Sequence, residues 1–114
     1  IKAMFEAVFN RFNIDPLAVN YVEAHGTGTA VGDLEEAEII DEYLCQNRSR
    51  NFPLLIGSVK SNLGHSETAS SLVSISKVII AIHKGIIPGN LHYKNRDPKI
   101  KGIHEGRLKV GFLR

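Results

Sequence analysis

Two histidines stand in short glycine-containing runs. His25 lies in residues 23–29 (EAHGTGT) and His65 lies in residues 60–67 (KSNLGHSE). Taken alone, either histidine would be an ordinary packed or surface residue, but glycine beside each one leaves room for a ligand to approach the backbone. Two imidazoles converging on one pocket can donate two hydrogen bonds to a single carbonyl oxygen. A developing enolate oxygen requires donors of this kind.

Each histidine follows a predicted strand and precedes a predicted helix. Apolar segments at residues 20–24 and 54–58 are compatible with short buried strands. The order strand, loop, helix occurs twice, which implies parallel strands with right-handed crossovers and an α/β fold. Functional loops of such sheets lie at the carboxyl ends of the strands. We therefore expect both histidines at one edge of the sheet.

Local signals predict the surrounding helices. Residues 1–13 are predicted to form an amphipathic helix, whose apolar face carries Met4, Ala7, Val8 and Phe12. Asp15-Pro16 fits an N-cap and the first position of a short turn. Asp33 is expected to cap the next helix, with Glu36 completing a capping box. That helix should end near Gln46 and bury Ala37, Ile40 and Leu44.

The second half of the chain shows a similar order. Residues 59–65 read as a loop, after which Ser66 is expected to cap a helix that Gly85 terminates. The predicted buried stripe of this helix consists of Leu72, Ile75, Val78, Ile79 and Ile82. Residues 86–93 are predicted to be extended and residues 107–110 to begin a strand.

Composition places the chain among soluble globular proteins. Of its 114 residues, 43% are hydrophobic and 23% are charged. The longest apolar stretch, Val78 to Ile82, is too short to span a bilayer, so no membrane span is expected. The chain starts without methionine at Ile1 and stops at Arg114 just after a strand has begun. Residues 1–114 are therefore expected to be incomplete at both ends.

The cysteine count and the distribution of charge exclude further classes of protein. Cys45 is the single cysteine, which excludes an internal disulfide and is consistent with a reducing compartment. No histidine pair has metal-ligand spacing on one helix face, so we predict no metal. Residues 94–114 hold 7 Lys/Arg and 2 Asp/Glu against 7 and 10 in residues 1–93. A solvated surface explains this basic tail better than nucleic acid binding, because no aromatic side chains are interleaved for base stacking.

The two histidine runs resemble the EAHGTGT and K-x-N-x-G-H-x-E motifs of the β-ketoacyl synthases, the condensing enzymes of fatty acid and polyketide assembly. The resemblance extends from residues 14–16 to residues 87–92 and 106–108. It implies the C-terminal part of a thiolase-like fold with five αβαβα layers. It also implies a partner, an acyl carrier protein that brings malonyl and acyl thioesters on phosphopantetheine, with no cofactor bound directly. A homodimer in the cytoplasm is the expected setting.

The resemblance assigns the main chemical roles. His25 and His65 match the two family histidines that assist loss of CO₂ from the malonyl group and stabilise the enolate. The family's nucleophilic cysteine lies upstream of the first histidine motif, hence outside this chain. Cys45, near a predicted helix end, is read as structural. Since that nucleophile is outside the chain, the chain by itself is expected to be inactive.

Four further residues receive supporting roles by the same resemblance. Lys60 matches the family lysine that orients the second histidine, and Glu67 matches its glutamate partner. Thr27 and Thr29 match the hydroxyls that line the pantetheine channel. The run Thr68-Ala69-Ser70-Ser71 departs from the family, because serine stands at its final position where the family has glycine.

Several alternatives remain at the level of the sequence. Residues 66–70 and 105–110 are most similar to the animal-type multifunctional fatty acid synthase, and the polyketide synthases are the alternative. A non-catalytic synthase-like module for dimerisation or carrier docking is a second. The third is an NAD(P)-binding module, because Gly26, Gly28 and Gly32 follow a strand, although their spacing differs from G-x-G-x-x-G.

Overall fold

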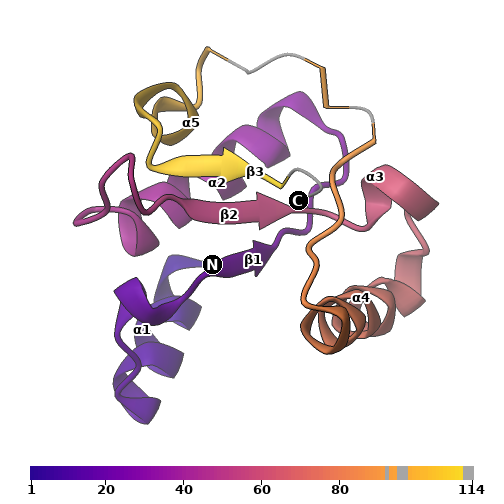
Figure 1. The fold of residues 1–114 in the computed structure, drawn as a ribbon, viewed down its shortest axis with the longest axis horizontal. Coiled ribbons are helices and arrows are strands. Elements are labelled where there is room, and N and C mark those ends of the chain that lie inside the picture. The colour runs from indigo at the N-terminus through magenta and orange to yellow at the C-terminus, as the bar shows by residue number, and fades with distance from the viewer. Residues whose placement is uncertain (92, 95–97, 112–114) are drawn as a thin grey trace.

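The computed structural model describes residues 1–91, 93–94 and 98–111, with Ala30 described by its backbone alone. The strands are β1 (Tyr21–Glu23), β2 (Leu54–Gly57) and β3 (Leu108–Val110). They form a parallel sheet in the order β1-β2-β3, as Figure 1 shows. In the register of β1 and β2, Glu23 pairs with Gly57, so these two strands end side by side. The predicted parallel α/β arrangement is confirmed.

The helices connect and cover these strands. They are α1 (Lys2–Phe12), α2 (Ala30–Leu44), α3 (Lys60–Leu63), α4 (Ser70–Lys84) and α5 (Lys101–Glu105), with 3₁₀ turns η1 (Pro16–Ala18) and η2 (Glu67–Ala69). Asp15 caps η1 as predicted, because its Oδ1 accepts the Leu17 N–H at 2.9 Å. Two helices were not predicted. α3 forms a single turn within the expected loop, and α5 precedes β3.

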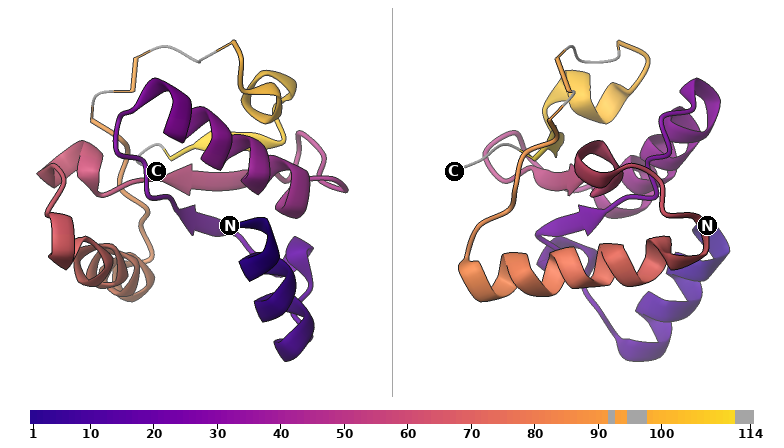
Figure 2. Two further views of the ribbon diagram at one scale, coloured as in Figure 1. Left: turned by 180° about the vertical axis from the view of Figure 1, so that it is seen from behind. Right: turned by 90° about the vertical axis from the view of Figure 1, so that its right-hand side faces the viewer.

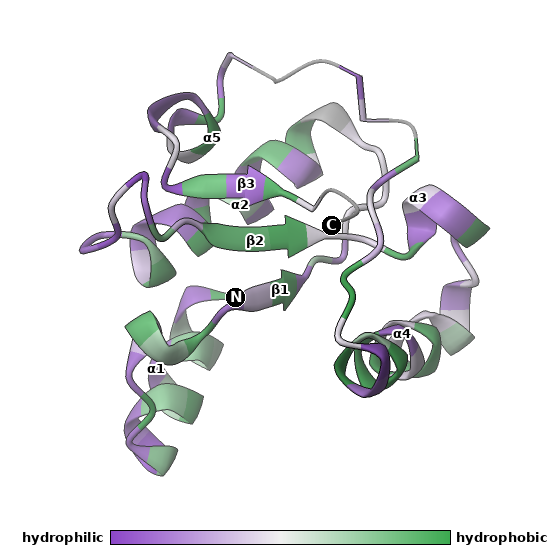
Figure 3. Ribbon diagram, viewed as in Figure 1, coloured by the Kyte–Doolittle hydropathy of each residue, from purple (hydrophilic) through white to green (hydrophobic). Residues whose placement is uncertain are grey.

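The core lies between the sheet and α2 with α5. Its largest fully buried side chains are those of Ile40, Leu44, Cys45, Leu54 and Leu108. Side chains along a strand alternate between the two faces of the sheet, so Leu54 and Ile56 reach this core while Leu55 points to the other side. β2 is apolar along its length (Figure 3), as expected for a central strand. The predicted burial of Ala37, Ile40 and Leu44 is confirmed.

α4 lies beside β1 at the edge of the sheet (Figure 2), and its orientation contradicts the predicted burial. Ala81 and the charged Lys77 are its buried residues. Most of the predicted stripe is exposed instead, namely Leu72, Ile75, Ile79 and Ile82. The reason lies in the strand beneath, because β1 presents polar Tyr21 and Glu23 side chains to the helix. The Lys77 face therefore turns toward the sheet.

α1 also presents a different face from the one predicted. Met4 is 58% and Phe12 64% exposed, whereas Phe5 and Phe9 pack against the core. The Phe5 ring stacks on Tyr43 of α2 at 5.5 Å, and Phe9 meets the same ring edge-on at 5.5 Å. Two aromatic residues four positions apart lie on one helix face. Their contact with Tyr43 decides which face of α1 is covered.

Two helix starts differ from the predictions. α2 begins at Ala30, so Asp33 and Glu36 lie inside it and neither caps it. α4 begins at Ser70 after η2, and Ser66 makes no side-chain cap. Gly85 ends α4 in the left-handed conformation (φ 67°), as predicted.

The last segment contains the predicted strand and a stretch without regular hydrogen-bonded structure. β3 confirms the strand expected at residues 107–110. No strand forms in the described part of residues 86–93, and residue 92 lies outside the described residues. No helix among the described residues is long and apolar enough to cross a bilayer.

Candidate functional site

The rings of the two histidines lie against each other at the carboxyl end of the sheet. His25 follows β1, and His65 follows β2 and α3. The ring centroids are 5.6 Å apart, and the ring planes are perpendicular. Both residues are exposed, so a substrate atom can reach them. The structure thus brings together two side chains that are 40 positions apart in the sequence.

A local backbone contact fixes the hydrogen-bonding state of His65. The Glu67 N–H donates to His65 Nδ1 at 3.3 Å, so Nδ1 is the acceptor in this contact. In the neutral ring the proton then resides on Nε2, which becomes a hydrogen-bond donor. Glu67 holds this contact with a φ of 46°, an uncommon value for a residue other than glycine. Gly64 (φ 78°, ψ −178°) adopts a conformation almost restricted to glycine just before the histidine.

Carboxylates from α2 brace the loop that carries His25. The two oxygens of Glu36 accept the His25 and Gly26 N–H groups at 2.7 and 2.9 Å. Asp33 accepts the Gly28 N–H at 3.1 Å. Sequence reasoning missed this bracing, because the acidic first turn has the pattern of a capping box.

The same bonds argue against the dinucleotide-binding alternative. A phosphate site in a glycine-rich loop uses free backbone N–H groups. In this loop, the N–H groups of His25, Gly26 and Gly28 already donate to carboxylates. The negative charges of those carboxylates also repel a phosphate.

The two histidine loops pack tightly where Gly26 meets Ser58. A Cβ atom added at Gly26 would lie 2.8 Å from Ser58 Cβ, closer than non-bonded carbons approach. Gly26 also has a φ of 46°, in the left-handed region. The Ser58 hydroxyl donates to the His25 carbonyl oxygen at 3.4 Å, and the Lys60 N–H lies 3.4 Å from the same hydroxyl. Ser58 therefore connects the start of α3 to the first loop.

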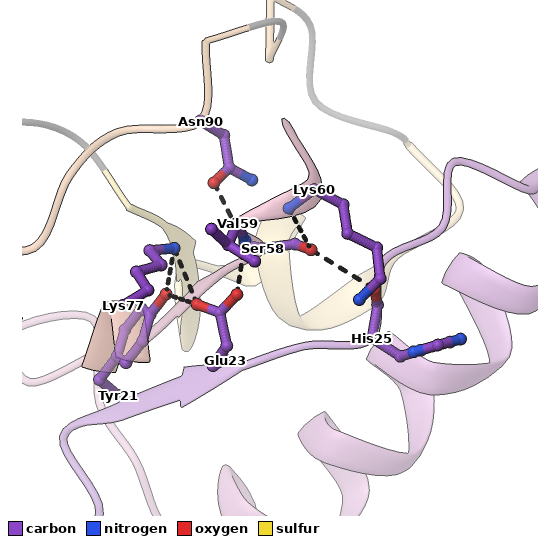
Figure 4. Close-up of polar contacts among 8 residues, drawn as sticks. All are labelled: Tyr21, Glu23, His25, Ser58, Val59, Lys60, Lys77 and Asn90. Carbon is purple, nitrogen blue, oxygen red and sulfur yellow. Dashed lines mark hydrogen bonds and ion pairs between the residues drawn. The ribbon is translucent and has the colours of Figure 1, made fainter. Parts of the chain in front are cut away.

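A buried polar cluster lies beneath the loops (Figure 4). Glu23 Oε2 accepts the Tyr21 hydroxyl at 2.5 Å and Lys77 Nζ at 2.8 Å, and its Oε1 accepts the Val59 N–H at 2.5 Å. Lys77 also donates to the Tyr21 oxygen at 2.9 Å. Burial, and then Glu23, raise the pKa of Tyr21, so its hydroxyl stays protonated and donates. A lone lysine in the apolar run of α4 was the available signal in the sequence.

The remaining predicted site residues are close to the histidines in the sequence, but they do not all make the contacts that were predicted for them. Lys60 is half-buried at the first position of α3, and it forms no ion pair with the exposed Glu67 in the described chain. Thr27 and Thr29 hydroxyls lie 3.4 Å apart. A cavity of about 240 Å³ is lined in part by His25 and Thr27. Thr29 does not line it.

Cys45 has the surroundings of a core residue. Its side chain is fully buried in the core cluster, at the C-terminal end of α2. Burial, followed by the nearby Asp41 carboxylate, raises the pKa of its thiol to about 11. A nucleophilic thiol needs a lowered pKa and access to substrate. Cys45 has neither, in agreement with its interpretation as structural.

Metal-ligating residues are not grouped in the described residues. No set of three or more His, Cys, Asp or Glu side chains there is placed to hold an ion.

Comparison with known proteins gives a consistent family. Residues 1–94 match the family described as the C-terminal domain of beta-ketoacyl synthase. The chain is 43% identical over 108 residues to one subunit of the phenolphthiocerol/phthiocerol polyketide synthase of Mycobacterium tuberculosis, covering 95% of this chain and 6% of that protein. It is 42% identical over 109 residues to the highly reducing polyketide synthase sdnO of Sordaria araneosa, covering 96% and 4%. It therefore spans only a small part of the curated relatives it matches.

Solved structures show the same likeness. The ketosynthase from module 1 of the bacillaene synthase of Bacillus amyloliquefaciens superimposes with a TM-score of 0.87 at 29% identity. The match covers 97% of this chain and 21% of that one. Ketosynthase twelve of the bacillaene synthase of the same species gives a TM-score of 0.87 at 30% identity. The sheet and helices thus have the thiolase-like arrangement expected from the sequence.

Proposed function

Because this chain belongs to the family of β-ketoacyl synthase C-terminal domains, we propose that His25 and His65 stabilise the enolate in a decarboxylative condensation. The observation that carries the proposal is the contact of the two rings, 5.6 Å apart, at the carboxyl ends of β1 and β2. The His65 Nε2–H, fixed by the Glu67 N–H at Nδ1, supplies one donor for an anionic oxygen. We infer that His25 supplies the other.

The proposed reaction joins a malonyl thioester to an acyl thioester. Loss of CO₂ leaves the electron pair of the broken C–C bond on the malonyl α-carbon, and charge spreads to the thioester oxygen. Two donors aimed at that oxygen lower the barrier and raise the rate, typically by a factor of about 10²–10³ each. The α-carbon then attacks the acyl carbonyl, and a cysteine thiolate leaves with the electron pair of the C–S bond. The product is a 3-oxoacyl thioester.

The chain would supply only part of this machinery. We propose that it is the C-terminal portion of a ketosynthase domain, whose nucleophilic cysteine lies elsewhere in the protein. The burial and the raised pKa of Cys45 support this division. Acyl carrier protein bearing phosphopantetheine, a homodimer and the cytoplasm are the proposed partner, assembly and location.

Polyketide assembly is the better supported context. The curated relatives from Mycobacterium and Sordaria are polyketide synthases, and the solved neighbours are ketosynthases of the bacillaene synthase. The animal-type fatty acid synthase expected from residues 66–70 and 105–110 is not confirmed by these likenesses. We therefore propose a polyketide synthase ketosynthase as the first context to test.

Supporting roles are proposed for four residues. Lys60, at the start of α3, would contribute positive charge beside the histidines, without the predicted Glu67 pairing. Glu67 would act through its backbone, which holds His65. We propose that Thr27, which lines the cavity beside His25, contacts the pantetheine arm, and that Thr29 assists through its hydroxyl, 3.4 Å from that of Thr27.

The test separates decarboxylation from acyl transfer in the ketosynthase that contains this chain. His25→Ala or His65→Ala should reduce CO₂ release from a malonyl thioester at least about 100-fold. Acylation of the nucleophilic cysteine by an acyl thioester should persist, because it requires no enolate. His104→Ala is the matched control, since His104 is exposed on α5. Near-normal CO₂ release in either site variant would refute the proposal.

A further inference from the structure

The buried ion pair between Glu23 and Lys77 links the end of β1, the middle of α4 and the segment that leads to His65. Glu23 ends β1, two residues before His25, and Lys77 lies in the middle of α4. Their side chains are only 7% and 8% exposed. Val59, which donates its N–H to Glu23, immediately precedes α3 and the second histidine run.

Stability alone is a poor explanation of such a pair. Taking two charges out of water is costly, and apolar residues of similar volume often serve the fold as well or better. The carboxylate of Glu23 nevertheless accepts three donors, from β1, α4 and the start of the second loop. A carboxylate with three donors from three segments fixes where those segments lie relative to one another.

The contacts around the pair are also close. Gly57 ends β2, and a Cβ atom there would lie 2.7 Å from the Tyr21 oxygen and 3.3 Å from Asn90 Oδ1. Asn90 Oδ1 accepts the Ser58 N–H at 3.2 Å, next to the Val59 N–H that Glu23 binds. Successive backbone N–H groups after β2 are thus held by two side chains (Figure 4). Little freedom is left for the segment that leads to His65.

We propose that Glu23 is a positioning residue for the condensation, which sets the separation of the two histidine loops through its hydrogen bond to the Val59 N–H, while Lys77 keeps its carboxylate in place. The inference rests on the proposed function, because it concerns the geometry of that site. Neither residue needs to touch substrate. Displacing one donor by about 1 Å can cost about 100-fold in rate.

Two double variants that lack both buried charges distinguish a positioning role of Glu23 from a role in stability alone. Glu23→Gln with Lys77→Met keeps an amide oxygen that can accept the Val59 N–H. Glu23→Leu with Lys77→Met fills the same space without an acceptor. Both remove the buried charges, so a purely structural role predicts folded proteins with equal rates.

The readout is CO₂ release from a malonyl thioester by the ketosynthase containing this chain, at a temperature well below its melting point. The Gln variant should keep kcat within about threefold of wild type. The Leu variant should lose about 10- to 100-fold in kcat with KM changed by less than about threefold, as seen when supporting residues of active sites are removed. Wild-type kcat in a folded Leu variant would overturn the inference.

A second variant tests the same bond without changing either charge. Val59 has φ −61° and ψ −23°, which proline adopts, so Val59→Pro deletes the N–H donor and exchanges the buried valine side chain for the proline ring. We expect its kcat to fall about tenfold or more, and an unchanged kcat would again overturn the inference. His25→Ala measured in parallel separates the two proposals. If His25→Ala retains decarboxylation, the proposed function is wrong. If His25→Ala is inactive while the Glu23 and Val59 variants keep wild-type kcat, the proposed function stands and only the positioning role is wrong.

Discussion

Replacing Gly26 by alanine should separate the histidine loops, since Gly26 is where they meet most closely. The new Cβ would lie 2.8 Å from Ser58 Cβ, an atom that cannot rotate away because it is bound to the backbone. Overpacking of this kind costs about 1–3 kcal/mol. The left-handed φ of 46° adds about 1 kcal/mol for alanine. The expected loss in the free energy of unfolding is therefore about 2–4 kcal/mol.

Gly28 provides the matched control in the same loop. Its φ is 85°, but a Cβ atom there meets nothing within 4 Å. Gly28→Ala should therefore cost only the conformational part, about 1 kcal/mol. Urea denaturation of the ketosynthase measures both costs, and CO₂ release from a malonyl thioester measures the effect on the histidines. Gly26→Ala should reduce that rate about tenfold or more, and Gly28→Ala less.

A double variant identifies the cause. Ser58→Gly removes the Cβ and the hydroxyl that Gly26→Ala would strike, so combining the two should recover about 1–3 kcal/mol relative to the additive expectation. Equal effects of the Gly26 and Gly28 substitutions, or strict additivity with Ser58→Gly, would refute the reasoning.

Two further predictions concern the core. Because burial raises the pKa of Cys45 to about 11, the neutral thiol should stabilise the fold below its unfolded pKa of about 8.5, and this contribution should be lost as the pH rises toward 11. Peptide mapping should accordingly show Cys45 unlabelled by maleimide at pH 8 in the native protein and labelled in urea. Gly102→Ala should lower the melting temperature, although alanine normally favours a helix, because its Cβ would lie 2.5 Å from Cγ of the Asp41 that binds Arg107. A higher melting temperature would contradict the packing described for α5.

The position of the histidine loops could be predicted because its signals are local. A short apolar strand before each glycine-containing run, and a helix after it, suffice to indicate parallel strands. His25 and His65 then share an edge of the sheet by topology. Gly85 likewise ends α4 through its own backbone preference.

The bracing of the His25 loop could not be predicted from local sequence signals. Asp33 and Glu36 fit a capping pattern by spacing, yet in space their carboxylates reach back over several residues to the loop amides. α5 gave little local signal, because it is short and contains Gly102, a weak helix former. Both the bracing and the formation of α5 depend on contacts with residues that are not adjacent in the sequence.

The rotation of α4 depends on contacts distant in the sequence. An apolar stripe predicts burial only if the facing surface is apolar. Here β1 presents Tyr21 and Glu23, and the Lys77 partner of Glu23 lies 54 positions away. A charge in a buried strand and a charge in an apolar helix are each visible in the sequence. Their pairing is visible only in the fold.

The two imidazoles are expected to donate hydrogen bonds to one substrate oxygen. A crystal structure of the ketosynthase containing this chain, with a malonyl thioester analogue that cannot lose CO₂, tests this expectation most directly. Our account predicts the thioester oxygen within about 2.7–3.2 Å of Nε2 of both His25 and His65. An oxygen bound elsewhere, or bound by His65 with His25 turned away, would contradict it.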